Sequence, residues 1–367
     1  MQFNISKDQF LKALTKVQGI IEKKHTIPIL ANVLIKADNG KLIITATDLE
    51  VGVKSEYKAD TVDNGSITIS GKKLFEIIKE LPDSIINFNT KNNYWVEIKC
   101  EKSVFNLVGL SPEDFPKFPE LDTENIKIDK NIIYEMIDKT FFSVSSDETK
   151  FNLTGIFFKL DENLLNLVST DGHRLSLVAR SYDGLNNEKF KRGFILPKKG
   201  ILELRKVLES ADNDVYLQVS DNNFSVSNHD TTLIMRMVDG EFPDYKRVIP
   251  EKGNNVSEID RNSFLSALKR ISILSSEKSK GVKLNLSKNN MTISSSNQDL
   301  GDAREELDII YSGDEISIGF NAKYIIDILN VIKSDKVLLY LKDNISPGRI
   351  SPVDDDNYLA VIMPMRI

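Results

Sequence analysis

One short pattern occurs three times along this chain of 367 residues. Each copy begins with isoleucine, a small polar residue and a basic residue, and continues with apolar residues at helical spacing. The copies begin at Ile5, Ile128 and Ile259. A second pattern of this kind follows each copy of the first, and it begins at Lys72, Lys199 and Lys323. Because internal repeats constrain architecture more than any single motif does, the sequence predicts three copies of one domain.

The ends of the first two copies indicate where one domain gives way to the next. Phe115-Pro116 and Phe242-Pro243 occupy equivalent places in these copies. Proline and glycine around them suit turns that lead out of a domain. We therefore expect domain 1 at residues 1–123, domain 2 at 124–251 and domain 3 at 252–367.

Two helices and several strands are expected in each copy. The first helix of each copy follows a residue whose side-chain oxygen can cap a free backbone N–H. These residues are Ser6, Asp129 and Asp260. Alternating β-branched runs, such as residues 41–47 and 164–170, predict strands between the helices. Glycine-rich strand-to-helix turns are absent from the sequence, so we predict an α+β fold with two helices packed on antiparallel sheets.

The composition is that of an ordinary soluble globular protein, with 41% hydrophobic and 28% charged residues. The single cysteine, Cys100, excludes a disulfide framework and a cysteine-based zinc site, and fits a reducing compartment. The N-terminus has no signal-peptide pattern, and no apolar stretch is long enough to span a membrane. We therefore expect a cytoplasmic protein without a membrane partner.

The sequence contains few features that are typical of an enzyme. Motifs of phosphate-binding loops, dinucleotide-binding turns, zinc proteases and serine hydrolases are all missing. The three histidines, His25, His173 and His229, lie far apart and have no companions at ligand spacing. We expect no catalytic residue, no metal and no cofactor.

Residues 169–175, Ser-Thr-Asp-Gly-His-Arg-Leu, allow two interpretations. In one, Asp171 and His173 form an acid–base couple; in the other, a strand ends in a turn shaped by Asp-Gly. Thr47-Asp48 stands at the same place in the first copy, which favours a structural role for the Thr-Asp pair. The segment from Gly172 to Leu175 is not repeated, and this makes it a candidate binding site.

Basic residues repeat on the expected helices although the net charge is −6. Nucleic-acid binding responds to the local field rather than to net charge. Repeated basic positions are Lys72, Lys199 and Lys323 on the second helices and Lys7, Lys130 and Arg261 on the first helices. Any single exposed lysine is usually only solvated, but repetition favours a shared basic surface. Such a surface would contact phosphates without reading bases.

The three copies, the segments 170–175 and 242–248, and the ending Met-Pro-Met-Arg-Ile at 363–367 together resemble the bacterial DNA polymerase III beta subunit family, the sliding clamps. The resemblance covers the whole chain. It implies a head-to-tail homodimer that closes a six-domain ring around duplex DNA without sequence specificity. Its implied partners are the DNA polymerase III alpha subunit, the clamp loader and other proteins with a clamp-binding motif.

The resemblance also implies three sets of residues. Residues expected to face DNA are Lys24, Lys72, Lys150, Lys198, Lys199, Arg205 and Lys206. A partner-peptide pocket is expected from Leu153, Thr170, Gly172, His173, Arg174, Leu175, Pro243, Val248, Val361, Met363, Pro364, Met365 and Arg366. The dimer interface is expected from Lys73, Phe105, Leu107, Ile273, Leu274, Asp302, Glu305 and Glu306.

The composition of the expected pocket suits hydrophobic anchors, since methionine adapts to varied partners, and Arg174 and Arg366 could orient a peptide. Two departures from the family pattern are visible. Pro347 replaces a small polar residue at the outer edge of the pocket. Gly301 and Arg304 interrupt an acidic run, which predicts a weaker ionic part of the dimer interface.

Three hypotheses for function remain open from the residues alone. The first is a non-enzymatic clamp that holds polymerase on DNA, and the second is an enzyme centred on Asp171 and His173. The third is a three-domain scaffold with no role on DNA.

Overall fold

The computed structural model describes residues 1–21, 27–182, 187–212, 214–251, 255–276 and 279–366. It confirms the six helices predicted by the repeat, two for each copy, and adds one short helix, α4 (Glu188–Arg192), within this part of the chain. The predicted helices are α1 (Lys7–Val17), α2 (Gly71–Glu80), α3 (Lys130–Phe141), α5 (Lys198–Ser210), α6 (Arg261–Ile271) and α7 (Ala322–Val331).

The predicted caps of the three first helices are confirmed. The Ser6 side chain accepts a hydrogen bond from the backbone N–H of Gln9, and the Asp260 side chain accepts one from Ser263. The Asp129 carboxylate accepts the backbone N–H of Asn131 at 2.8 Å. Each cap satisfies a backbone donor that the first turn of a helix leaves without a partner.

The chain divides into two compact units, described separately below. The first comprises residues 1–133 and 199–237, and the second comprises residues 134–198 and 238–367. All pairings between the named strands are antiparallel, as predicted.

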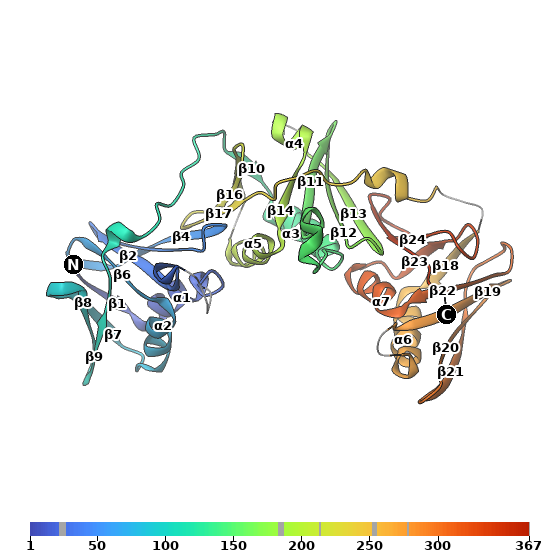
Figure 1. Ribbon diagram of the computed structural model, residues 1–367, viewed down its shortest axis with the longest axis horizontal. Coiled ribbons are helices and arrows are strands. Elements are labelled where there is room, and N and C mark those ends of the chain that lie inside the picture. The colour runs from blue at the N-terminus through green and yellow to red at the C-terminus, as the bar shows by residue number, and fades with distance from the viewer. Residues whose placement is uncertain (22–26, 183–186, 213, 252–254, 277–278, 367) are drawn as a thin grey trace. The chain divides into compact units, whose positions relative to one another are not determined.

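The first unit contains a five-stranded and an eight-stranded sheet. The five-stranded sheet has the order β5 (Asp60–Asp63), β1 (Gln2–Ser6), β7 (Ile85–Thr90), β8 (Trp95–Cys100), β9 (Ser103–Val108). The eight-stranded sheet has the order β10 (Ile126–Ile128), β15 (Val215–Val219), β16 (Asn223–Ser227), β17 (Thr231–Arg236), β4 (Val51–Lys58), β3 (Lys41–Thr47), β2 (Asn32–Asp38), β6 (Gly65–Ser70). Helix α1 packs against α2 and against β3 and β4, so this helix pair lies on the sheets as predicted (Figure 1).

The second unit contains an eight-stranded and a four-stranded sheet. The larger has the order β14 (Phe194–Pro197), β11 (Gly155–Asp161), β12 (Leu164–Thr170), β13 (Arg174–Ser181), β25 (Tyr358–Ile362), β24 (Gly348–Pro352), β23 (Lys336–Tyr340), β18 (Val256–Asp260). The smaller has the order β21 (Gly301–Asp308), β20 (Asn290–Asn297), β19 (Gly281–Ser287), β22 (Ile316–Asn321). Helices α6 and α7 pack side by side here (Figure 1).

Consecutive copies of the repeat share a sheet. Strand β4 of the first copy pairs with β17, the last strand of the second copy. Strand β13 of the second copy pairs in the same way with β25, the last strand of the third copy. The second copy therefore contributes strands to both of its neighbours, and this explains why a threefold repeat forms two compact units.

Apolar side chains at the predicted helical positions form the core beneath α1. Phe10 of α1 is fully buried and meets the rings of Phe3 and Phe88, which stack at a centroid distance of 4.8 Å.

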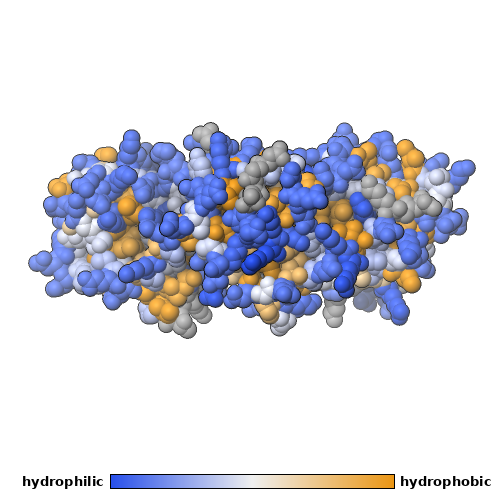
Figure 2. Space-filling view, turned by 90° about the horizontal axis from the view of Figure 1, so that it is seen from above, coloured by the Kyte–Doolittle hydropathy of each residue, from blue (hydrophilic) through white to orange (hydrophobic). Residues whose placement is uncertain are grey.

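Polar side chains dominate the face of the molecule in Figure 2, with smaller hydrophobic areas between them.

A cluster of four charged side chains joins copies two and three inside the second unit. Arg180 Nη2 lies 2.7 Å from Asp355 and 2.6 Å from Glu135. Lys139 Nζ lies 2.8 Å from Asp355 and 2.7 Å from Glu135. Partial burial opposes ionisation of both carboxyls, but the hydrogen bonds from Arg180 and Lys139 outweigh it and lower the pKa of Asp355 and of Glu135.

This cluster predicts a loss of stability in acid. Since both carboxyls have a lowered pKa in the folded state, their contribution is complete above the ordinary carboxyl pKa of about 4 and is lost as pH falls below it. Asp355→Asn should lower the opening free energy of β13 and β25 by about 1–3 kcal/mol at pH 7 and flatten its fall in acid. Amide hydrogen exchange between pH 7 and pH 3 measures this. Parallel curves for wild type and variant would contradict the assignment.

Candidate partner-binding site

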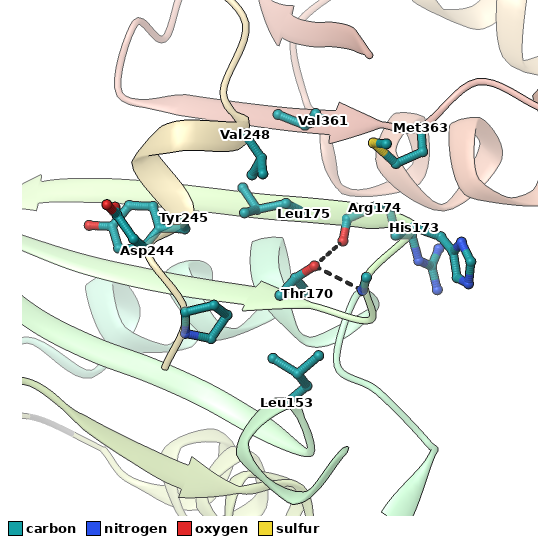
Figure 3. Close-up of a pocket in the computed structure, with 12 residues that line it drawn as sticks. Leu153, Thr170, His173, Arg174, Leu175, Asp244, Tyr245, Val248, Val361 and Met363 are labelled. Carbon is teal, nitrogen blue, oxygen red and sulfur yellow. Dashed lines mark hydrogen bonds between the residues drawn. The ribbon is translucent and has the colours of Figure 1, made fainter. Parts of the chain in front are cut away.

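An apolar pocket of about 210 Å³ opens in the second unit (Figure 3). Its walls come from the turn between β12 and β13, from β25, and from the short 3-10 helices at Glu148–Leu153 and Tyr245–Val248. The residues that line it are Leu153, Thr170, Gly172, His173, Arg174, Leu175, Pro243, Asp244, Tyr245, Val248, Val361 and Met363.

The structure brings together all but three of the residues predicted for the pocket. Pro364, Met365 and Arg366 are not among the lining residues. The Met363 N–H donates to the carbonyl of His173 at 2.8 Å, which holds Met363 against the β12–β13 turn. The Met365 N–H donates to the carbonyl of Gly319 at 2.9 Å, so the chain beyond Met363 follows β22 instead of the pocket wall.

Two lining residues, Asp244 and Tyr245, are missing from the sequence prediction. Both directly follow Pro243 in the segment 242–248, so the motif itself was a signal for them. Burial first, and then the nearby carboxylates of Asp161 and Asp244, raise the pKa of Tyr245 to about 12. Its hydroxyl therefore stays protonated at neutral pH, and it has no hydrogen-bond partner among the residues that the structure describes.

Cross-strand pairing builds the apolar floor of the pocket. Leu175 on β13 lies opposite Val361 on β25, and residues opposite one another project from the same face of a sheet. Tyr245 packs with both of them in one buried cluster, and partly buried Ile249 packs against it. The segment between copies two and three thus packs on the sheet, and the pocket lies beside this segment.

The Thr-Asp pair before the pocket is a turn-forming element, as its repetition predicts. The Thr170 hydroxyl donates to the carbonyl of Arg174 at 2.6 Å, and one Asp171 carboxylate oxygen accepts the backbone N–H groups of His173 and Arg174. In the first copy Thr47 donates to the carbonyl of Val51, and Asp48 accepts the N–H groups of Glu50 and Val51. The two turns share one hydrogen-bond pattern.

The geometry of this turn contradicts the acid–base interpretation. Asp171 receives the backbone N–H of His173, while its other carboxylate oxygen lies 3.0 Å from Nε of Arg174. Both oxygens of the carboxylate are therefore engaged away from the imidazole of His173. Among the described residues, no group of histidine, cysteine, aspartate and glutamate could hold a metal ion.

Arg174 lines the pocket, but most of its hydrogen-bonding capacity is directed into the protein. Nε bonds Asp171, Nη1 bonds Asp327 of α7 at 2.7 Å, and Nη2 bonds the carbonyl of Phe142 at 2.6 Å. The guanidinium also lies 4.4 Å from the ring centroid of Tyr324. Arg174 therefore holds the pocket turn, the end of α3 and the middle of α7 together.

The residues expected to face DNA have mixed surroundings, and Lys24 lies outside the described residues. Lys72 is exposed at the start of α2, and Lys150 lies in the 3-10 helix Glu148–Leu153 beside Gly172. The others are on α5. Lys198 donates to the hydroxyl of Ser146 at 2.9 Å. Lys199 lies 2.5 Å from the Asp48 carboxylate, and Lys206 lies 2.7 Å from the Glu203 carboxylate. Arg205 is on the same helix.

Five of the residues expected at a dimer interface lie on two edge strands, one in each unit. Phe105 and Leu107 are on β9, an edge strand of the first unit. Lys73 of the same unit is on α2, where it pairs with Glu76 at 2.9 Å. Asp302, Glu305 and Glu306 are on β21, an edge strand of the second unit. Ile273 and Leu274 form the 3-10 helix Ser272–Leu274, which packs against β21. Glu305 accepts a hydrogen bond from Nε of Arg270 at 3.0 Å.

No helix in the described part of the chain has both the length and the apolar character that a membrane span requires.

Comparisons with known proteins agree with this architecture along the whole chain. Family models of the DNA polymerase III beta subunit match in tandem: the N-terminal domain at residues 1–119, the central domain at 127–244 and the C-terminal domain at 246–366. The beta sliding clamp of Haemophilus influenzae is 35% identical and that of Escherichia coli 31% identical, each over the full length of both chains.

Solved structures give the same result. The DNA polymerase III subunit beta of Pseudomonas aeruginosa matches with a TM-score of 0.95 and 33% identity over all of both chains. The sliding clamp of Bartonella birtlesii, solved with bound griselimycin, matches with a TM-score of 0.95 and 32% identity over all of both chains.

The fold and the tandem matches define a DNA sliding clamp, a class of non-catalytic processivity factors. The chain belongs to the family of the DNA polymerase III beta subunit, the beta sliding clamp. The resemblance predicted from the sequence is thereby confirmed, and the enzyme and scaffold hypotheses are set aside.

Proposed function

We propose that two copies of this chain close head to tail into a ring around duplex DNA. The observation that carries the proposal is the repetition of one pairing rule. In both junctions within the chain, the third strand after the first helix of one copy (β4 or β13) pairs with the last strand of the next copy (β17 or β25). Strand β21 holds the first of these positions in copy three, and β9 holds the second in copy one; both are sheet edges.

The pairing of β21 with β9 of a second chain would extend the same rule across the subunits. Uncovered edges favour pairing with another strand, and a head-to-tail contact closes a ring when its rotation permits. Side chains at the two edges support this partner, because Phe105 on β9 and Ile273 beside β21 are exposed apolar residues in the single chain. The expected domain boundaries near residues 123 and 251 accompany this proposal, and the tandem family matches support them.

Inside the ring, the lysines and Arg205 expected to face DNA would contact phosphates, so that binding is independent of sequence and the ring can slide. Retention on DNA would then be topological and would need only weak contacts. We propose that the protein acts in the cytoplasm, on the chromosome, together with the DNA polymerase III alpha subunit and a clamp loader.

The apolar pocket is the proposed site for peptides of the polymerase, the loader and other clamp-binding proteins. Its lining of leucine, valine, proline and methionine suits hydrophobic anchor side chains. A volume of about 210 Å³ favours one or two anchor side chains from an extended peptide.

Loading onto circular DNA tests the ring. The protein, loaded on nicked circular plasmid by a bacterial clamp loader with ATP, should remain bound through gel filtration. Cutting the plasmid once with a restriction enzyme should then release the protein, because a ring that slides can come off the DNA at a free end. Equal retention on circular and linear DNA would exclude topological binding.

A further inference from the structure

The first helix of each copy carries a basic residue at the same place in its last turn. These residues are Lys16, Lys139 and Arg270. In copies one and two this cation pairs with an acid that stands shortly before the last strand of the next copy. Lys16 Nζ lies 3.3 Å from Asp230, before β17, and Lys139 Nζ lies 2.8 Å from Asp355, before β25. Each junction within the chain therefore combines strand pairing with an ion pair of this kind.

The cation of copy three pairs within its own copy instead. Nε of Arg270 donates to Glu305 on β21 at 3.0 Å, and Nη2 donates to the same carboxylate. Nη1 has no partner among the described residues, and the side chain is 58% exposed. Since a guanidinium has five N–H donors, Arg270 can also bind a second carboxylate. Lys139 binds two in this way, Glu135 of its own copy and Asp355 of the next.

The strand register of the junctions indicates which acid of a second subunit comes near Arg270. Strands β4, β13 and β21 are equivalent, and each has eight residues. Thr231, the first residue of β17, lies opposite Ser55, the fifth residue of β4. Tyr358, the first residue of β25, lies opposite Val178, the fifth residue of β13. The same register across the subunits would put the first residue of β9 opposite Glu305.

The two-residue turn before β9 consists of Glu101 and Lys102, both exposed. Glu101 forms no ion pair among the residues that the structure describes. Helix α6 packs against β21 (Figure 1), and its Arg270 is bound to Glu305. A turn that ends opposite Glu305 is therefore within reach of the Arg270 guanidinium.

We propose that Arg270 of one subunit pairs with the partner subunit's Glu101, and that this pair makes the chain select a copy of itself. The inference rests on the proposed ring. It assigns to the contact between subunits the same kind of ion pair that Lys16 and Lys139 form at the junctions within the chain.

The other charges near this contact are compatible with the pair. Asp302, Arg304 and Glu306 alternate with Glu305 along β21, so they project from its other face. Arg304 and Glu306 already pair with each other at 2.6 Å. Lys102 is the second charge of the turn, and Glu305 is an acid that it can bind. The contact then holds two cations and two acids, as the charged cluster between copies two and three does.

Charge reversal tests the proposal. Arg270→Glu and Glu101→Arg should each raise the dimer Kd by roughly one to two powers of ten, because each ring contains the contact twice. Glu101→Arg leaves the pair of Arg270 with Glu305 intact, so its effect arises between the subunits. The chain that carries both changes should dimerise about as well as wild type. Sedimentation velocity at low ionic strength measures the Kd values, and circular dichroism checks that each variant is folded.

Mixing of two chains gives a second readout. In a ring of one wild-type and one doubly reversed chain, two positive side chains would meet at one contact and two negative ones at the other. Energy transfer between chains labelled with different fluorophores should therefore show about tenfold fewer mixed dimers than wild type forms with itself. The matched control is Lys41→Glu with Glu56→Lys, which reverses an exposed pair on β3 and β4 and should mix freely with wild type.

The outcomes separate the ion pair from the ring on which it rests. Wild-type chains that stay monomeric at every concentration would overturn the ring. If wild type dimerises but the doubly reversed chain mixes freely with it, the ion pair is wrong and the ring stands. Single variants with the Kd of wild type, or a double variant as weak as the single ones, would also exclude the ion pair.

Discussion

Replacing Arg174 by alanine should destabilise the second unit by about 3–5 kcal/mol, because it removes one partner from a buried ion pair. The Arg174 side chain is nearly buried and pairs with Asp171 and Asp327, whose carboxylates lie 3.0 Å and 2.7 Å from it. After the substitution both carboxylates and the carbonyl of Phe142 lose a donor. The change in the free energy of unfolding can be measured by urea denaturation.

The same variant should weaken binding of a peptide with hydrophobic anchor side chains, because this guanidinium ties the pocket turn to α7. A matched control is Arg247→Ala. Arg247 also pairs with an aspartate three residues away, at 2.8 Å, but its side chain is 84% exposed. Exposed pairs contribute about 0–1 kcal/mol, so this variant should be nearly as stable as wild type. Equal losses for the two variants would show that the buried network does not stabilise the unit.

The threefold repeat allowed most of the fold to be predicted, because the same pattern of helices and caps occurs in all three copies. Helix positions, the caps at Ser6, Asp129 and Asp260, and the turn formed by Thr170 and Asp171 all depend on residues close together in the chain. Local hydrogen bonds and apolar spacing are enough to predict such elements. Most of the pocket could also be predicted, since its residues fall within a few recognisable segments.

The roles of individual side chains in that pocket could not be predicted in this way. The ion pair of Arg174 with Asp327 joins the pocket turn to a helix far along the chain, so no nearby residue indicated it. The path of Met365 toward Gly319 likewise depends on a contact between distant segments.

Replacing Ile273 by aspartate should convert the dimer to monomers while leaving the single chain folded. Ile273 is 74% exposed, so the folded chain gains little from its side chain. Burial of an isoleucine on association is worth about 1.5–3 kcal/mol, and a head-to-tail ring contains the contact twice. The loss of about 3–6 kcal/mol corresponds to a dimer Kd raised by roughly two to four powers of ten.

Sedimentation velocity over a range of concentrations measures this Kd, and Ile345→Asp is the matched control. Ile345 is 78% exposed in the same unit but lies outside the expected interface, so the same change there should leave the dimer intact. The aspartate at residue 273 should act more strongly than loss of the isoleucine alone, because it would place a charge against the apolar β9 edge around Phe105. Identical Kd values for the two variants would place the subunit contact elsewhere than at β21, and the pairing rule of the two internal junctions would then not extend across the subunits.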